Sequence, residues 1–485
     1  MKELINRYKW LILFGIIIEA VFLGVMWGSE AKLTTLIGAL MIPAVIIILV
    51  YMAKSLENTL ITVAFTIPLL PLIGYVMLRL NLLNLQWVAY VLYYIVVAAL
   101  LIKNGLLKKL DGKNIKVKDK YLRIALMILL VVNIFFAFNK GLSLMIVLLS
   151  FVPFILYTYI LRALNYKNKG EFLNKILIAL SLGCIFSSIP DILYFFMTWA
   201  QGDKNIRIFG PLGSNFILIY DLLILIIILA KWANIKGIKN IWCWLAVAMS
   251  FIISMQLSRG AWISFMLIFL MFLIFNISNW KRYIAIILVF GSMLTYNVFQ
   301  RPDVANDSNL HEVQEIITGN AHESKLESNS AFSDIIKKVL ESQSKTRQIL
   351  WKAGIDITAD YPYTGVGIGN FKYFYQEYSG SERPYSDAHN IFLNMSTELG
   401  VPFMILGMIL LVIVGLTSLI NYFKNKDNRL KKSYLALMTI AGIVLVYGNL
   451  TGIAFQTTNE IYSFTPTFIF TFILLYRDYI EEFSI

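Results

Sequence analysis

Long uninterrupted apolar segments recur along most of this chain and limit what it can fold into. Runs of about 17–25 apolar residues are each long enough to cross a hydrocarbon core of roughly 30 Å as an α-helix. Apolar residues make up 58% of the 485 residues and charged residues only 15%, with a mean hydropathy of +0.71. The sequence therefore predicts an all-α, polytopic membrane protein.

We expect about fourteen membrane-spanning helices, within a range of about twelve to fourteen. The predicted spans are residues 10–27, 33–52, 59–78, 86–102, 122–138, 141–161, 176–200, 214–230, 241–257, 261–278, 283–299, 391–420, 434–450 and 462–477. The chain then divides into residues 1–299 with the first eleven spans, a large loop of residues 300–388 containing helices, and residues 389–485 with the last three spans and a short tail. The first apolar run lacks a small-x-small exit, so we expect it to remain as a helix.

The basic residues predict the orientation of these spans. Most of the 42 Lys and Arg residues fall in segments that share one side when the N-terminus is inside, and few fall in the short loops of the other side. Cytoplasmic loops are enriched in this way, so we expect both termini in the cytoplasm and the large loop outside the cytoplasmic membrane. The net charge of +13 is then a topology signal, and no nucleic-acid partner is expected.

The two cysteines do not predict a covalent or metal-bound framework. Cys184 and Cys243 both lie within or beside apolar helices, and neither has a histidine at the spacing of metal ligands. We expect no disulfide, no metal and no cofactor.

The longest polar stretch, from Arg347 to Pro402, interrupts the apolar runs where chemistry is expected. It contains the helical pattern RQILWKAGIDI after Arg347 and ends with SDAHN, in which His389 precedes the next apolar helix. Arg207 and Arg259 lie in two other breaks between apolar runs. All four side chains fall on the predicted outer face, where they can converge on one anionic ligand.

These motifs together resemble the O-antigen ligase and Wzy-type polysaccharide polymerase superfamily. The similar features are R-x-x-G-P at Arg207, SRGAW at Arg259, R-x-x-x-W-x-A-G at Arg347 and H-N-x-x-L-x-x-x-x-E-x-G at His389, spread over somewhat more than half of the chain. The resemblance implies a GT-C-like, metal-independent, inverting glycosyltransferase that uses undecaprenyl-diphosphate-linked glycans. It also implies that Arg207, Arg347 and His389 are the essential groups. The sequence departs from the family in its number of spans and in lacking N-P-N after Asn215.

The residue types suit this chemistry. Arginine presents a planar fork of donors that matches phosphate oxygens and remains charged at any working pH. Two arginines can replace a divalent metal in stabilising the charge on a leaving diphosphate. A neutral histidine is the usual base near pH 7 for removing the proton of an acceptor hydroxyl.

Each of these residues also has a structural interpretation. Arg207 can be an interfacial anchor, and Arg259 is as readily a structural residue as a ligand-binding one. Arg347 can simply solvate its helix, and His389 can be a polar residue at a helix start. The resemblance favours the functional interpretation for Arg207, Arg347 and His389.

A polar stripe follows His389 along one face of the next helix. Asn390, Asn394, Thr397 and Glu398 recur at helical spacing, and polar groups on a membrane helix normally face protein or a wet cavity. We predict that Arg259, Asn390, Asn394 and Glu398 bind substrate. For Glu398, a plain interhelical hydrogen bond is an equal alternative.

Local signals predict the limits of that helix. Ser386 or Asp387 is expected to cap its start, while Gly400 and Pro402 should break it. The run GVGIG at 365–369 has no surrounding βαβ unit, so we interpret it as a tight loop after Pro362 and not as a nucleotide fingerprint. The positive helix end favours a neutral His389, whereas the Asp387 carboxylate opposes this.

Three functions remain after these observations. The first is a polymerase that transfers a lipid-linked glycan onto a lipid-linked repeat unit, with a flippase and a chain-length regulator as partners. The second is a ligase that passes finished glycan to lipid A core or protein. The third is a flippase, for which repeat symmetry and a midplane site would be expected. The gathering of polar groups at the outer face favours a transferase.

Overall fold

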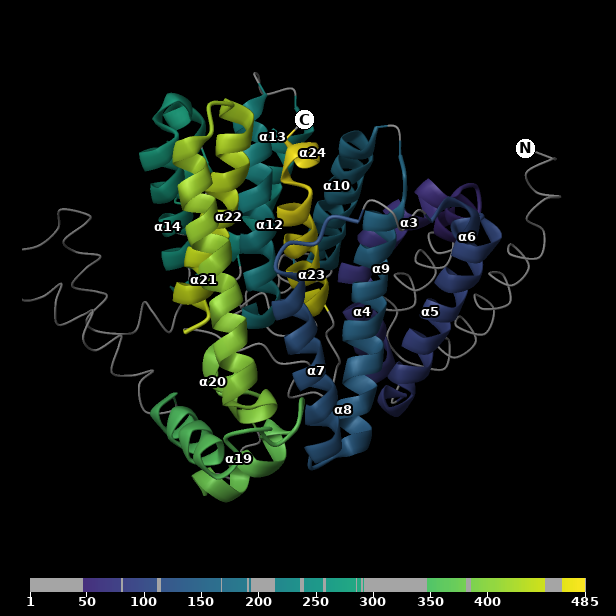
Figure 1. Cartoon of the computed structure of the whole chain (residues 1–485), viewed down its shortest axis with the longest axis vertical. Coiled ribbons are helices and arrows are strands. Elements are labelled where there is room, and N and C mark those ends of the chain that lie inside the picture. Colours follow the sequence, from purple (N-terminus) through teal and green to yellow (C-terminus); the bar gives the residue numbers. More distant parts are fainter. Residues whose placement is uncertain are drawn as a thin grey trace, which may run out of the picture.

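The computed structural model of the chain describes a helical membrane protein (Figure 1). It describes residues 47–79, 82–110, 115–166, 168–189, 192, 214–235, 240–255, 259–284, 286–288, 291, 347–380, 385–449 and 465–484. Within these residues there are helices and no strand, apart from one isolated antiparallel bridge between Leu110 and Leu164. The predicted all-α class is confirmed for this part of the chain.

The described helices are mostly apolar and range from single turns to membrane-length elements. They are α3 (Leu56–Thr66), η1 (Ile67–Leu69), α4 (Leu70–Arg79), η2 (Leu83–Leu85), α5 (Gln86–Lys103), α6 (Leu106–Lys109), α7 (Lys120–Phe136), α8 (Lys140–Ile146), η4 (Val147–Phe151), α9 (Val152–Ala163), α10 (Lys169–Ser187), α12 (Ser214–Asn234), α13 (Ile241–Met255), α14 (Arg259–Phe275), η5 (Ile277–Asn279), α19 (Phe371–Ser379), α20 (Ile391–Leu399), α21 (Val401–Lys424), α22 (Asn428–Tyr447), α23 (Thr465–Asp478) and α24 (Ile480–Phe483). Residues 347–360 form a further helix.

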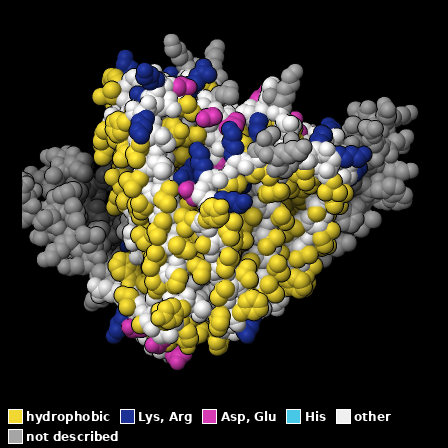
Figure 2. All heavy atoms as spheres, in the orientation of Figure 1, with side chains coloured by type: hydrophobic (Ala, Val, Ile, Leu, Met, Phe, Trp, Pro, Cys, Tyr) yellow, Lys and Arg dark blue, Asp and Glu magenta, His cyan; other side chains and the backbone are white. Residues whose placement is uncertain are grey.

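Six segments of the described residues are long and apolar enough to cross a membrane. They are Leu56–Gly74, Gln86–Lys103, Lys140–Ala163, Lys169–Ser187, Val401–Lys424 and Asn428–Tyr447. Figure 2 shows hydrophobic side chains covering the middle of the visible face, with Lys and Arg gathered mainly above them. The chain is therefore a multi-pass membrane protein, while the total of about fourteen spans and the GT-C-like topology stay predictions.

The predicted span over residues 391–420 is wrong, because the structure divides it into two helices. α20 ends at Leu399, Gly400 takes a φ of 88°, and α21 then begins at Val401 with a proline in its first turn. This φ suits glycine, and proline cannot continue a preceding helix, so the two residues force the break that the sequence predicted. The membrane-length helix is Val401–Lys424.

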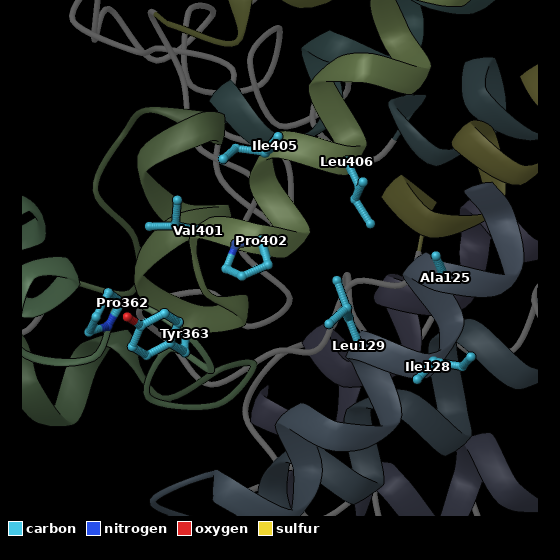
Figure 3. Close-up of a pocket in the computed structure, with 9 residues that line it drawn as sticks. All are labelled: Ala125, Ile128, Leu129, Pro362, Tyr363, Val401, Pro402, Ile405 and Leu406. Atoms are coloured by element: carbon cyan, nitrogen blue, oxygen red, sulfur yellow. The ribbon is translucent and has the colours of Figure 1, made fainter. Parts of the chain in front are cut away.

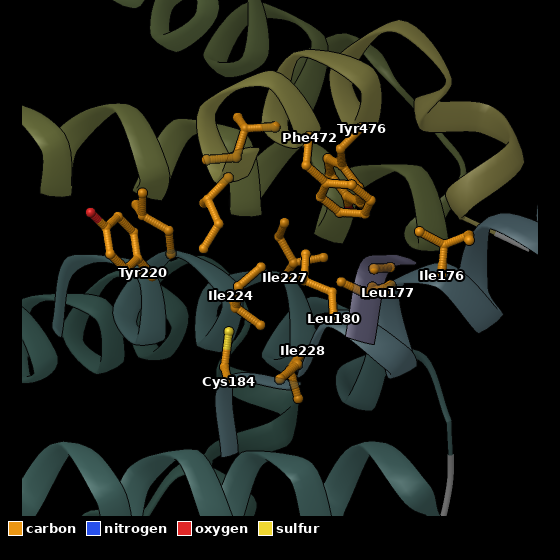
Figure 4. Packing of buried hydrophobic residues seen from close by; sticks show 14 of the residues in the cluster. Ile176, Leu177, Leu180, Cys184, Tyr220, Ile224, Ile227, Ile228, Phe472 and Tyr476 are labelled. Atoms are coloured by element: carbon orange, nitrogen blue, oxygen red, sulfur yellow. The ribbon is translucent and has the colours of Figure 1, made fainter. Parts of the chain in front are cut away.

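The core is formed by helices from distant parts of the chain. Figure 4 shows Leu180 and Cys184 of α10 against Ile224 and Ile228 of α12, with Phe472 of α23 packed over them. All of these side chains are almost completely buried. Cys184 and Cys243 are both buried and free, as expected.

A charged cluster holds the end of α23 against helices from the first half of the chain. The Asp478 carboxylate accepts hydrogen bonds of 2.8 Å from both terminal nitrogens of Arg123, and of 3.1 and 2.9 Å from Nε and Nη2 of Arg162. Its neighbour Arg477 forms an ion pair with Asp119. The end of α23 is therefore held against the start of α7 and the end of α9, at the end of the molecule away from α19 (Figure 1).

Candidate functional site

The site is built on two short helices that run side by side in the same direction. The Leu393 side chain of α20 packs on Gly354, where an added Cβ atom would lie 2.8 Å from its Cδ2. One turn later, the Thr358 and Ser396 hydroxyls are 3.2 Å apart. Because both helices advance together along this contact, their first turns lie at the same end. Arg347 and His389 are therefore brought together.

His389 is held in a tight turn by Asp387. The backbone of His389 has a φ of 51°, in the left-handed region. Oδ1 of Asp387 accepts a hydrogen bond from the His389 backbone N–H at 2.5 Å and lies 2.6 Å from Nδ1 of the ring. The Asp387 side chain is fully buried, whereas that of His389 is 29% exposed. The imidazole is thus held at Nδ1 and is partly exposed.

The carboxylate dominates the protonation of His389. The negative charge of Asp387 raises the pKa of His389 above its usual value, against the opposing effects of burial and of the positive charge of Arg347. The sequence left open whether Asp387 or the helix end would prevail, and the structure decides for Asp387. Arg347 is the positive charge that opposes this rise.

The predicted cap of α20 is wrong, because Asn390 takes that position. Its side-chain oxygen accepts hydrogen bonds from the N–H groups of Phe392 and Leu393, at 3.0 and 3.1 Å. Asn394 is buried, and its Oδ1 accepts the Ala388 N–H at 2.6 Å. Both asparagines therefore shape the turn around His389. Their predicted contact with substrate stays a prediction.

Glu398 lies inside the protein at the other end of α20. Its Oε1 accepts the backbone N–H of Phe371, the first residue of α19, at 3.2 Å. Burial raises the pKa of the Glu398 carboxyl to about 8, while backbone N–H groups of Gly369 and Phe371 act in the opposite direction. The interhelical hydrogen bond weighed from the sequence is present, and substrate binding by Glu398 stays a prediction.

The glycine loop, residues 362–370, joins this pair of helices to α7 and α8. Val366 and Gly367 donate their backbone N–H groups to the carbonyls of Thr397 and Glu398 at 2.8 and 2.9 Å. Gly365, Gly367 and Gly369 all have positive φ, which glycine adopts without strain. The predicted tight loop is confirmed.

Sequence reasoning missed the residue that anchors the glycine loop. Asn133 of α7 donates to the carbonyl oxygens of Thr364 and Glu398 at 2.6 and 2.7 Å and accepts the Ile368 N–H at 3.1 Å. It is the lone amide in the apolar run 122–138, and a polar residue inside such a run signals a buried partner. That signal was available in the sequence, although it did not identify the partner.

Of the other two predicted arginines, the structure describes only Arg259. Arg207 lies outside the described residues. Arg259 is the first residue of α14, four residues beyond the described end of α13. In the described part of the chain, no three His, Cys, Asp or Glu side chains cluster as metal ligands.

An apolar groove of about 660 Å³ lies beside the glycine loop, between α7 and α21 (Figure 3). Ile128 and Leu129 line it from α7, Val401 and Ile405 from α21, and Tyr363 from the loop. It offers no charged side chain, so this groove is not where an anionic group would bind.

Residues 244–407 match the family described as O-antigen ligase. This region is an O-antigen ligase domain. It contains Arg259, Arg347, His389 and Glu398, but not Arg207. The resemblance predicted from the motifs is therefore confirmed over this part of the chain.

A search of curated proteins found no match. Members of this family are glycosyltransferase-like enzymes, and the match supports a function of the ligase or polymerase type. The site combines His389, which is held by the buried Asp387 carboxylate, with Arg347, whose positive charge acts against the rise in the pKa of His389. Such an arrangement can accept a proton beside a bound anion.

Proposed function

We propose that this protein is a polysaccharide polymerase that transfers a glycan from undecaprenyl diphosphate onto a lipid-linked repeat unit. The observation that carries the proposal is the convergence of Arg347 and the Asp387-held His389 within the O-antigen ligase domain. The donor, the acceptor and the inverting, metal-independent course of the reaction all belong to the proposal. So do a flippase and a chain-length regulator as partners, and membrane lipids as the surroundings.

The reaction takes place at the outer face of the bacterial cytoplasmic membrane. Lys and Arg gather mainly at the upper end of the view in Figure 2, and α19 lies at the lower end in Figure 1. A cytoplasmic upper end follows the usual enrichment of cytoplasmic segments in basic residues. The helix of residues 347–360, α19 and the turn at His389 then lie outside, where a flipped lipid-linked glycan is presented.

The chemistry divides between the two side chains. Arg347, together with Arg207 as the second predicted arginine, binds the donor diphosphate and stabilises the charge that develops on it as it leaves. His389 accepts the proton of the acceptor hydroxyl while that oxygen attacks the anomeric carbon. Attack on the face opposite the diphosphate inverts the configuration at that carbon.

A polymerase differs from a ligase in needing two lipid-diphosphate substrates at once. The outer segments carry basic residues beyond Arg207 and Arg347, among them Arg259, Lys352 and Lys372. A second anionic lipid therefore has candidate partners on the same face. A ligase, the alternative, needs only the donor site and a surface for a different acceptor.

The deciding experiment gives purified protein in vesicles only its lipid-linked repeat unit. A polymerase will produce a ladder of longer lipid-linked chains, and EDTA will leave that ladder unchanged. If no ladder forms but the same glycan is transferred to added lipid A core or protein, the ligase replaces the polymerase. Inactivation by EDTA that Mg²⁺ or Mn²⁺ reverses would overturn the metal-independent course.

A further inference from the structure

Asp387 contacts His389 at two points, its backbone and its ring. In the described part of the chain, the Asp387 carboxylate makes its two hydrogen-bonding contacts with His389, one with the backbone N–H and one with Nδ1 of the ring. The other carboxylate oxygen, Oδ2, is buried and has no hydrogen-bond partner among the described residues. Among the described residues, the buried Asp387 carboxylate is therefore bonded only to His389.

We infer that Asp387 is a positioning residue for glycan transfer, which holds His389 as the tautomer protonated at Nδ1 and leaves Nε2 as the base. This inference rests on the proposed function. Asp387 itself touches no reacting atom; it acts through His389.

The distance between the ring and the carboxylate determines the tautomer. Oδ1 of Asp387 lies 2.6 Å from Nδ1, and a carboxylate oxygen is only an acceptor. An unprotonated Nδ1 would direct its lone pair at that oxygen, which is repulsive at this distance. The neutral ring therefore keeps its proton on Nδ1 and has its lone pair on Nε2.

The same oxygen also fixes where the ring points. Because Oδ1 binds the backbone N–H and Nδ1 of one residue, it sets the side-chain torsions of His389 relative to its own main chain. Asn394 stabilises the turn from α20 by accepting the Ala388 N–H. Tyr385 packs edge-on against the ring, with centroids 6.0 Å apart. Because Nδ1 is occupied by Asp387, Nε2 is the ring nitrogen that remains to accept a proton.

The proton balance of the step explains why a buried carboxylate is useful there. The acceptor oxygen forms a bond to the anomeric carbon, the bond from that carbon to the diphosphate oxygen breaks, and the hydroxyl proton moves to Nε2. The ring is then an imidazolium, whose charge Asp387 stabilises and Arg347 opposes. The lipid diphosphate leaves as the anion, and the proton on Nε2 passes to water before the next cycle.

Three titratable or charged groups lie around the ring. Asp387 lies in the same turn and Arg347 on the helix of residues 347–360, and the charge of Asp387 also raises the pKa of Glu398 on α20. Of these, Asp387 has the largest influence on the pKa of His389, and it raises that pKa. Removing its charge should therefore lower the pKa and extend the active form of the base to lower pH.

The test uses the fact that the chain has only three histidines. With His311→Gln and His322→Gln, His389 is the single histidine, and ¹⁵N NMR of the labelled protein in lipid reports which nitrogen carries the proton. We expect Nδ1 to be protonated in the neutral ring. In Asp387→Ala we expect a mixture of both tautomers. A neutral ring protonated at Nε2 in the parent protein would overturn the inference.

Two further variants separate the charge of Asp387 from its shape. Asp387→Asn keeps an acceptor oxygen but loses the charge, so the acid limb of the transfer rate should move to lower pH and the rate should fall roughly 10–100-fold, as for residues that orient a functional ligand. Asp356→Asn, on the neighbouring helix, is the control and should match the parent protein. An unchanged pH profile in Asp387→Asn contradicts the inference. If the protein transfers no glycan at all, the proposed function fails, while the NMR result still decides whether Asp387 sets the tautomer.

Discussion

At the scale of single residues, the structure explains why His389 is governed by Asp387 and not by the helix beside it. The cap of α20 is Asn390, so His389 lies one residue outside the helix. The field of a helix end acts mainly within its first turn. The carboxylate of Asp387, in direct contact with the ring, therefore outweighs it.

Replacing His389 by asparagine tests its role as the base. Asparagine tolerates the left-handed backbone that this position requires, so the fold should be retained where alanine would be strained. A general base typically contributes ~10²–10⁴-fold, and we expect a loss of that size in ladder formation. Thermal stability should remain close to the parent value. Transfer above a few per cent of the parent rate, in normally folded His389→Asn, would rule His389 out as the base.

Arg347→Lys tests whether the shape of the guanidinium matters. Lysine keeps the positive charge but loses the planar fork that binds two phosphate oxygens at once, so transfer should be strongly impaired. Gln348→Ala, at the exposed neighbouring position, is the control and should behave as the parent. Normal transfer by Arg347→Lys would mean that only the charge is needed, and the proposed binding of diphosphate by a fork would be wrong.

The buried Glu398 predicts a pH dependence of stability. Its folded pKa of about 8 lies above the reference value of 4.5, so the folded state holds this proton more tightly than the unfolded state. This part of the stability is complete below about pH 4.5 and is lost as the pH rises through 8. Glu398→Gln mimics the protonated acid and should gain thermal stability relative to the parent between pH 5 and about pH 8. Glu377→Gln, on the exposed face of α19, should show no such gain.

At the scale of elements, the glycine loop is the connection that sets α20 against α7. Its backbone is bonded to the last carbonyls of α20 on one side and to Asn133 of α7 on the other. A Cβ atom on Gly365 would lie 2.5 Å from the backbone carbon of Glu398. The loop can approach the end of α20 this closely because Gly365 has no side chain.

Two alanine variants separate this close approach from backbone strain. Gly365 and Gly380 have φ values of 63° and 64°, but a Cβ on Gly380 would meet nothing within 4 Å. Both variants therefore bear the cost of left-handed backbone, about 1–2 kcal/mol. Gly365→Ala should lose ~1–3 kcal/mol more, because the helix and loop must separate. Equal thermal midpoints for the two variants would show that the close approach contributes nothing.

At the scale of the whole molecule, the two ends of the bundle are held by different means. The end with α20 is joined by backbone and amide hydrogen bonds, whereas the opposite end is joined by the Asp478 cluster. Arg123 and Arg162 come from the first half of the chain, and Asp478 is the last residue of α23. Closure of this end therefore depends on residues more than 300 positions apart.

Asp478→Asn tests that closure. Removing one partner from a buried ion pair leaves uncompensated charge and typically costs about 3–5 kcal/mol, so the thermal midpoint should fall markedly. Glu57→Gln breaks the exposed pair with Lys175, whose side chains are 37% and 46% exposed, and is the control. Exposed pairs contribute about 0–1 kcal/mol, so its midpoint should hardly change. Similar thermal midpoints for both variants would show that the Asp478 cluster does not stabilise the packing of α23.

The sequence by itself determined the all-α class, the break before α21 and the resemblance to the O-antigen ligase family that residues 244–407 match. In lipid, an apolar run of membrane length satisfies its backbone hydrogen bonds as a helix. Gly400 and Pro402 end the preceding helix through their own backbone chemistry. These are local consequences of composition and backbone chemistry. The same local signals failed at the cap of α20, because Ser386, Asp387 and Asn390 are all good caps and only the course of the chain chooses among them.

Only the tertiary structure decided which groups meet. Arg347 and His389 are separated by the glycine loop and α19, and they come together because two short helices pack side by side in the same direction. Asn133 reaches the glycine loop from more than 200 residues away. Asp387 prevails over the helix end through a contact of 2.6 Å, and electrostatic effects of this kind depend on distance and burial. Neither quantity is contained in the order of the residues.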